Sequence, residues 1–216
     1  MAGLDTKQKI LAAAVGCFNS RGLVNARLQH IADEAFMSLG NLTYHFRNKE
    51  AILQAIWTQI EGQQSLLLTE FRILPLFEDI ERLMISTFEL QQQYAFFYLD
   101  TLDIVRNYPD ISIRYRQLVL WQIQQLELAL EFNKSRGAFR SELLKEEQMQ
   151  TLATQFWITA NSWMYCCHVQ GEPANDYKKF QQALWGLLFP YFTDIGLQES
   201  RQTLALLSDK DGIFGN

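Results

Sequence analysis

The sequence predicts an all-helical fold. Apolar residues recur at the three- and four-residue spacing of amphipathic helices through nearly the whole chain. Sustained period-two alternation does not occur, and no Asn-Gly or Asp-Gly turn joins two β-branched runs. The helical patterns break mostly at residues that end helices, namely Pro75, Pro109, Pro173, Pro190, Gly22, Gly137 and Gly171. At 216 residues the chain is long enough for a small head and a larger body.

Composition indicates a soluble globular protein. The chain is 48% hydrophobic and 20% charged, which does not indicate extended disorder. It has no run of about 18 apolar residues, and its first seven residues lack the apolar core of a signal peptide. We therefore expect a cytoplasmic protein that does not associate with membranes.

The cysteines do not suggest a metal site or a disulfide scaffold. They are Cys17, Cys166 and Cys167, an odd number without the C-x-x-C spacing of tetrahedral metal sites. His168 follows the pair, but neighbouring residues on a helix point about 100° apart and do not converge on one ion. We expect reduced, packed thiols, no metal and no cofactor.

Charge is divided unevenly along the chain. The net charge is -5, yet residues 1–54 hold six Lys and Arg against four Asp and Glu, or +2, and residues 55–216 hold 13 against 20, or -7. A basic head on an acidic body slightly favours nucleic acid as a partner.

The first 60 residues predict four helices. The first begins at Asp5, whose spacing to Gln8 fits a capping box, and ends at position 22. A short second helix covers 28–35, and Ser38 suits the N-cap of another short helix, which buries Leu42 and Phe46. A long helix follows from Lys49. Further helices are expected near 77–93, 95–106, 110–134, 142–168, 174–192 and 197–207.

Two short helices joined by about four residues form a helix-turn-helix, in which the second helix enters the major groove of DNA. Short helix pairs also form ordinary corners in larger bundles, and this alternative stays open on pattern alone.

Residues 7–57 resemble the DNA-binding head of TetR-type regulators. The matching residues, in order and at the family's separations, are Ile10, Leu11, Ala14, Phe18, Gly22, Ile31, Ala32, Ala35, Ser38, Gly40, Asn41, Leu42, Tyr44, His45, Phe46, Lys49, Glu50 and Leu53. The resemblance implies a non-enzymatic transcriptional regulator with a helix-turn-helix domain over residues 1–50 and a ligand-binding and dimerisation domain over 51–216. It implies a homodimer on a palindromic, double-stranded DNA operator, acting as a repressor that a small-molecule effector releases; an activator remains open.

The chemistry of the recognition residues fits that role. Gly40 allows the backbone to approach DNA closely, and the amide of Asn41 can donate to and accept from a base edge. The remaining expected DNA contacts, mainly to phosphate, come from Arg27, Gln29, Leu39, Thr43, Tyr44, His45 and Lys49.

Several positions depart from the family's pattern. Phe36 stands where a small turn residue is usual, so the turn is altered or the ring covers the junction with the first helix. Leu39 and Thr43 replace a polar residue and a tyrosine, and a leucine can contact a thymine methyl group or weaken DNA binding. Asn25 is expected to cap the second helix.

The resemblance places dimerisation on the helices near 145–168 and 174–192. Apolar and aromatic residues recur there at helical spacing, and those expected at the interface are Phe156, Trp163, Met164, Cys167, Leu184, Leu188 and Tyr191. The alternative is that they pack inside one subunit.

An aromatic-rich region between the head and these helices is the expected ligand pocket. Its candidate residues are Phe88, Phe97, Asp100, Trp121, Gln125 and Trp157. Aromatic rings with acidic groups suit a cationic ligand, although such stripes are more often core. The helix over about 49–72 is the expected lever between ligand and DNA.

Two other functions compete with a DNA-binding regulator. An enzyme or lipid carrier is disfavoured because no G-x-S-x-G, phosphate-binding glycine loop, H-E-x-x-H or paired-carboxylate pattern occurs and the chain has three histidines. The second rival is a ligand-binding helical dimer that has lost specific DNA binding, for which Leu39 and Thr43 are the best evidence.

Overall fold

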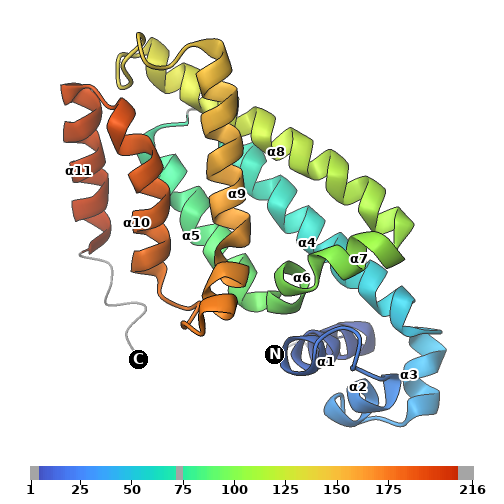
Figure 1. The fold of residues 1–216 in the computed structure, drawn as a ribbon. Helices are drawn as coiled ribbons and strands as arrows, with labels where there is room; N and C mark the ends of the chain where they lie inside the picture. Colours follow the sequence, from blue (N-terminus) through green and yellow to red (C-terminus); the bar gives the residue numbers. More distant parts are fainter. Residues whose placement is uncertain (1–4, 72–74, 209–216) are drawn as a thin grey trace. The chain divides into compact units, whose positions relative to one another are not determined.

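The structure, a computed structural model, confirms the all-helical prediction. It describes residues 5–71 and 75–208, which form eleven α-helices, one short 3-10 helix and no named strand (Figure 1). The ends of the two predicted domains, residues 1–4 and 209–216, lie outside the described residues. Among the described helices, none is both long and apolar enough to cross a membrane.

The N-terminal helices follow the sequence pattern closely. They are α1 (Thr6–Arg21), α2 (Leu28–Glu34), α3 (Leu39–His45) and α4 (Lys49–Phe71). Asp5 is the N-cap of α1 as expected, but its side chain makes no capping hydrogen bond, so the predicted capping box does not form. Gly22 ends α1 with a φ of 76°, which a glycine adopts at little cost.

The central helices differ from the prediction at one point. They are α5 (Phe77–Gln93), α6 (Ala95–Leu99), α7 (Thr101–Asn107) and α8 (Pro109–Ser135). The single helix expected over 95–106 is divided at Asp100, which is the C-cap of α6 and the N-cap of α7. Apolar spacing continues through the break, so the pattern alone does not reveal it.

The C-terminal helices are α9 (Glu146–Gln170), α10 (Tyr177–Leu188) and α11 (Asp194–Ser208), with a 3-10 turn over Phe189–Tyr191 between the last two. The helices predicted over 142–168 and 174–192 are therefore shorter at their starts. Gly171 ends α9 in the left-handed conformation, with a φ of 70°. α9 and α10 pack side by side (Figure 1).

The chain divides into two compact units. Unit 1 comprises residues 1–64 and 90–116, and unit 2 comprises residues 65–89 and 117–216. This division does not follow the boundary expected at residue 50, because α6, α7 and the start of α8 belong with the head. Helices α4, α5 and α8 each contribute residues to both units.

An aromatic cluster forms the interior of unit 1. The Trp57 indole stacks on Phe97 with 5.2 Å between ring centroids, and Tyr115 meets both rings edge-on. Burial raises the pKa of Tyr115 to about 12.

Unit 2 is held by a buried carboxylate as well as by apolar packing. Glu81 of α5 is fully buried, and three side chains one helical turn apart on α10 donate hydrogen bonds to it. These are the Tyr177 hydroxyl at 2.6 Å, the Gln181 amide at 2.5 Å and the Trp185 indole at 2.5 Å. Neutral donors thus satisfy the carboxylate and fix α5 against α10.

Gly196 of α11 permits a close backbone approach in unit 2. A Cβ atom at this position would lie 2.2 Å from the Ala138 carbonyl oxygen and 3.1 Å from the Phe192 ring. The neighbouring segments are joined by the bridge between Phe139 and Phe192 and by the Thr193 amide, which donates to the same Ala138 oxygen. Any side chain at 196 must displace this backbone.

Candidate functional site

Helices α2 and α3 form the predicted helix-turn-helix, and α1 packs against α2. Ser38 is the N-cap of α3, and its Oγ accepts from the Asn41 backbone amide at 3.2 Å. Leu42 and Phe46 are buried as predicted, which holds α3 with its opposite face exposed. The N-cap of α2 is Arg27; the expected cap, Asn25, instead donates to the Arg21 carbonyl oxygen.

The residues predicted to read bases lie on the exposed face of α3. Leu39, Gly40 and Asn41 are all exposed at its first turn, and the Asn41 side-chain amide has no hydrogen-bond partner within the described part of the chain. A Cβ added to Gly40 would meet only the Ser38 hydroxyl, at 4.0 Å. The space beside Gly40 is therefore open at this turn.

The polar residues predicted to contact phosphate differ in exposure and in whether their side chains already make hydrogen bonds. Tyr44 is 84% exposed, and its ring meets that of His45 edge-on at 5.2 Å. The Thr43 hydroxyl donates to the Gly40 carbonyl oxygen, and Gln29 donates to Asp33 within α2. Arg27 is exposed at the start of α2.

Lys49 is engaged in hydrogen bonds with the protein's own backbone. Its Nζ donates to the backbone carbonyl oxygens of Leu23, Val24 and Ala26, at 2.7, 3.2 and 3.0 Å. Burial lowers the pKa of its ammonium group. The ammonium therefore neutralises a cluster of carbonyl dipoles in the connection between α1 and α2.

Arg47 is a candidate contact that the sequence reasoning missed. It is exposed between α3 and α4 and makes no hydrogen bond or ion pair within the described residues. Its position directly after the recognition helix, two residues before Lys49, was the available signal. Asn48, between them, caps α4 by accepting from the Ala51 amide at 2.9 Å.

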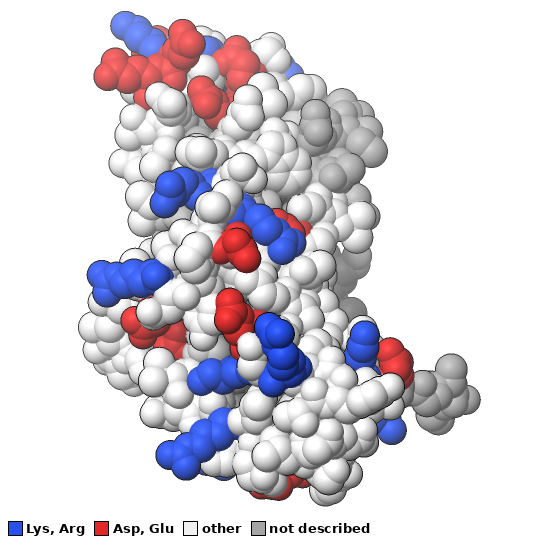
Figure 2. Space-filling model, turned by 90° about the vertical axis from the view of Figure 1, so that its right-hand side faces the viewer, with Lys and Arg blue, Asp and Glu red and all other residues white. Residues whose placement is uncertain are grey.

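Positive charge is dispersed on the face shown in Figure 2. Lys and Arg side chains stand singly or in small groups there, with Asp and Glu among them. On this face, the positive charge does not form one continuous basic patch.

The turn between α2 and α3 contains a strained residue. Phe36 has a φ of 55°, the only positive φ of a non-glycine residue in the described chain. Its amide donates to the Asp33 carbonyl, and the Met37 amide donates to that of Ala32, which is the Schellman arrangement that usually places glycine at position 36. The Phe36 side chain is 97% exposed, so it does not cover the junction with α1.

Helix α1 is tied to α6 within unit 1. The Asn19 amide donates to the Gln93 carbonyl oxygen at 2.9 Å, and its side-chain oxygen accepts from the Phe96 amide at 3.0 Å. The carboxylate of Asp100 accepts from the Leu23 amide at 2.8 Å. The head is therefore hydrogen-bonded to a segment more than 70 residues away.

The structure distributes the predicted pocket residues between the units. Phe97 lies in the aromatic cluster of unit 1, and Asp100 holds the Leu23 amide. The other four belong to unit 2, namely Phe88, Trp121, Gln125 and Trp157. The Trp157 indole donates to Gln122 at 2.8 Å, which is a contact between α9 and α8.

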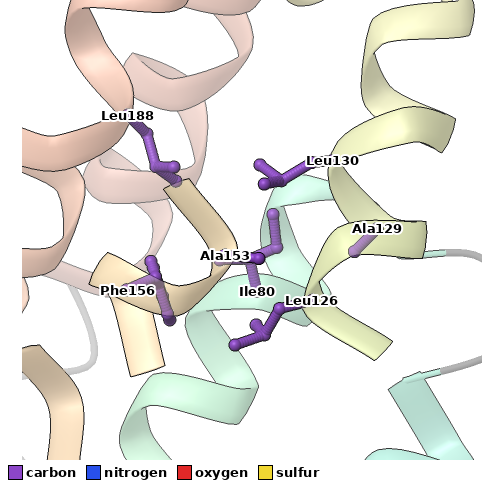
Figure 3. A pocket seen from close by; sticks show the side chains of 7 residues that line it. All are labelled: Ile80, Leu126, Ala129, Leu130, Ala153, Phe156 and Leu188. Atoms are coloured by element: carbon purple, nitrogen blue, oxygen red, sulfur yellow. The ribbon is translucent and has the colours of Figure 1, made fainter. Parts of the chain in front are cut away.

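A small cavity is present in unit 2 among α5, α8, α9 and α10. Its volume is about 10 Å³, room for roughly one water molecule. The side chains around it are all apolar, namely Ile80, Leu126, Ala129, Leu130, Ala153, Phe156 and Leu188 (Figure 3). None of the predicted pocket residues lines it.

The residues predicted at a dimer interface mostly point into unit 2. Five of the seven are buried in the single chain, namely Phe156, Met164, Cys167, Leu184 and Leu188, while Trp163 and Tyr191 pack against the same core. The exposed apolar side chains lie on other faces: Ile158, Tyr165 and Val169 on α9, and Phe189 after α10.

The three cysteines differ in their exposure to solvent. Cys17 and Cys167 are buried, Cys166 is exposed and all three are free thiols. Within the described residues no three His, Cys, Asp or Glu side chains are grouped as metal ligands.

Comparisons with known families cover most of the chain. Residues 10–56 match the family model described as bacterial regulatory proteins of the tetR family, and residues 59–199 match a TetR model described as a bacterial transcriptional repressor.

Solved structures share the fold at low sequence identity. A TetR-family transcriptional regulator from Marinobacter aquaeolei VT8 is 24% identical, with a TM-score of 0.80 over 95% of this chain and 98% of that one. SmeT, the repressor of the Stenotrophomonas maltophilia multidrug efflux pump SmeDEF, was solved in complex with triclosan. That complex is 22% identical, with a TM-score of 0.60 over 88% and 92% of the chains.

The fatty acid degradation regulator FadR from Bacillus halodurans is 17% identical, with a TM-score of 0.60 over 87% and 98% of the chains. The two family models together span the head and most of the helical body, and α3 lies within the residues that the tetR-family model matches. The chain belongs to the TetR family of DNA-binding transcriptional regulators.

Proposed function

We propose that this protein binds a palindromic operator as a homodimer in the cytoplasm, represses transcription there, and is released by a small molecule. The observation that supports this best is the recognition helix α3, capped by Ser38, with Gly40 and the unpartnered Asn41 amide exposed at its first turn. The first turn of a recognition helix is the part that reaches base edges.

Each side chain is then assigned a role at the DNA according to whether it already has a hydrogen-bond partner within the protein. Asn41 reads a base edge beside Gly40, and Tyr44 contacts the phosphate backbone. Arg47 supplies a charged phosphate contact because its guanidinium has no partner within the described residues. Lys49 acts indirectly, because its Nζ already holds three carbonyl oxygens and sets the position of α2.

The dimer interface is proposed on the outward faces of α9 and α10. Ile158, Tyr165 and Val169 are 49%, 56% and 66% exposed and follow one face of α9. Phe189 is exposed at the end of α10, and Gly186 one turn earlier leaves the helix surface open for a partner. Apolar side chains on the outside of a single chain are the ones that gain from burial in a dimer.

The effector is proposed to be apolar and to enlarge the cavity of unit 2. A volume of about 10 Å³ cannot hold a drug-sized molecule, which needs about 300 Å³ or more. An apolar lining favours ligands such as the triclosan found in SmeT. The expected cationic ligand has less support, because Asp100 is already hydrogen-bonded to the Leu23 amide.

Helices α4, α5 and α8 are the proposed route of coupling, because each contributes to both units. A ligand that separates helices in unit 2 prefers a state with different spacing of the two recognition helices, and it weakens DNA binding by its differential affinity for the two states. Half-sites require a spacing of about 34–36 Å or a multiple of it.

Selection of bound sequences from a random pool of duplex DNA, with the purified protein at near-physiological salt, tests this function. We expect a palindrome whose affinity falls steeply with salt, because phosphate contacts release counterions. A folded dimer that enriches no sequence would contradict operator binding and favour the alternative, a ligand-binding dimer that has lost specific DNA binding.

A further inference from the structure

The exposed ring of Phe36 lies beside the recognition helix, and no ring contact with another described residue accounts for its position. The Schellman turn between α2 and α3 requires a left-handed residue at position 36, and Phe36 occupies it with a φ of 55°. A bulky side chain in this region is a true outlier, because its Cβ approaches the following carbonyl oxygen. Glycine would avoid the strain, so the phenyl ring is unfavourable for folding at this position.

The ring gains nothing from packing within the chain. Phe36 is 97% exposed, more than any other large hydrophobic residue described. It makes none of the ring contacts that link other aromatic residues of unit 1, such as Phe18 with Phe96. The backbone strain is a cost to folding, and burial of the ring within the described chain does not offset it, which together indicate a partner outside the chain.

Position in the fold identifies that partner. Phe36 precedes the N-cap Ser38 by two residues, and Leu39, itself 39% exposed, is the first residue of α3. The turn is therefore continuous with the end of the helix that enters the major groove of DNA. Apolar groups there have one apolar feature to meet on base edges, the C5-methyl group of thymine.

We propose that Phe36, together with Leu39, forms an apolar reading edge that contacts thymine methyl groups in each operator half-site. This inference rests on the proposed operator binding and adds a class of contact to it: recognition of thymine by its methyl group, beside the hydrogen bonding of Asn41. It also gives Leu39 a role in specificity in place of a polar residue.

The test is a cycle of protein and DNA changes on the selected operator. Replacing each thymine in turn by deoxyuridine removes only the methyl group, and the wild-type protein should lose about fourfold in affinity at one or two positions, the scale expected for burying one CH₂-sized group. Phe36→Gly should bind the unmodified operator roughly tenfold more weakly and lose sensitivity to deoxyuridine at a Phe36 position.

Stability provides a second, opposite readout. Phe36→Gly should unfold at a higher denaturant concentration than the wild type, because glycine adopts a positive φ without strain. Phe36→Asn, which tolerates the same conformation but lacks the ring, should bind as weakly as the glycine variant. The control Leu102→Ala removes an exposed apolar side chain from α7 and should leave operator affinity unchanged.

Three results would overturn the proposal. The first is a Phe36→Gly protein with wild-type affinity, and the second is a loss of affinity that is equal for thymine and deoxyuridine operators. The third is a loss seen only with two adjacent operators, which would assign the ring to contacts between neighbouring dimers. Absence of any sequence-specific DNA binding by the wild type would overturn the proposed function as well, whereas the other results leave it standing.

Discussion

Lys49→Met removes the ammonium group that holds the connection between α1 and α2 while keeping an unbranched apolar side chain. In the native head the Nζ donates to the carbonyl oxygens of Leu23, Val24 and Ala26. Hydrogen bonds involving a charged group each contribute about 1.5–3 kcal/mol. Because Lys49 is only partly buried, water replaces some of them in the variant, and we expect a total loss of about 2 kcal/mol.

The assays are urea and thermal denaturation, both followed by far-UV circular dichroism, together with operator binding across a salt series. A loss of about 2 kcal/mol corresponds to a thermal midpoint lower by roughly 4–8 °C for a chain of this size. The slope of log affinity against log salt should stay at the wild-type value, because no phosphate contact is removed.

Arg47→Ala is the matched comparison. It should leave the free energy of unfolding unchanged within about 0.5 kcal/mol, because Arg47 is exposed and unpartnered within the described residues. Its salt slope should fall by about 1.8 for a dimer, at 0.9 per phosphate contact. The division of roles is refuted if Lys49→Met keeps its stability and reduces the salt slope instead.

Four further outcomes are expected. Asn41→Ala should relax selection at one or two base positions and leave the others intact, as measured by repeating the random-pool selection; a uniform loss would mean a backbone contact. Tyr165→Glu should shift the protein from dimer to monomer in sedimentation, since it places a charge on the outward face of α9; an unchanged dimer would place the interface elsewhere. Gly196→Ala should destabilise the fold by about 2 kcal/mol because its Cβ collides with backbone, whereas Gly62→Ala, with open space around it, should not; equal stabilities would contradict the close approach. Burial raises the pKa of Tyr115 from 10.0 in the unfolded chain to about 12 in the folded one, so its contribution to stability is complete below pH 10 and is lost as the pH rises above 10. Between pH 8 and 11, the free energy of unfolding should therefore fall by about 1 kcal/mol less in Tyr115→Phe than in the wild type, as measured by urea titration.

Local sequence signals predicted the head well. Gly22 ends α1 and Ser38 begins α3, both as expected. The spacing of Leu42 and Phe46 correctly predicted the buried face of α3. These features depend on interactions within a few residues, which propensity and periodicity report directly.

Long-range contacts were beyond the same reasoning. Periodicity showed that Leu184 and Leu188 share a face, but not that this face is the interior and that Ile158 and Tyr165 face outward. In a helix with two apolar faces, both faces show helical spacing. Which face is buried in the subunit depends on the neighbouring helices, which the spacing does not reveal. Lys49 is similar, since its carbonyl partners lie 23 to 26 residues earlier in the chain.

The link from Asp100 to the Leu23 amide spans 77 residues, and it changes which parts of the chain have to move together. Asn19 of α1 also bonds to the Gln93 carbonyl oxygen and the Phe96 amide at the start of α6, so α1 and the segment after it together have partners at both ends of α6. These hydrogen bonds lead us to propose that the head moves together with α6, in place of the movement on α4 alone that the sequence led us to expect. On this proposal, a ligand that changes the spacing of the recognition helices acts through the unit 2 portions of α5 and α8 as well as through α4.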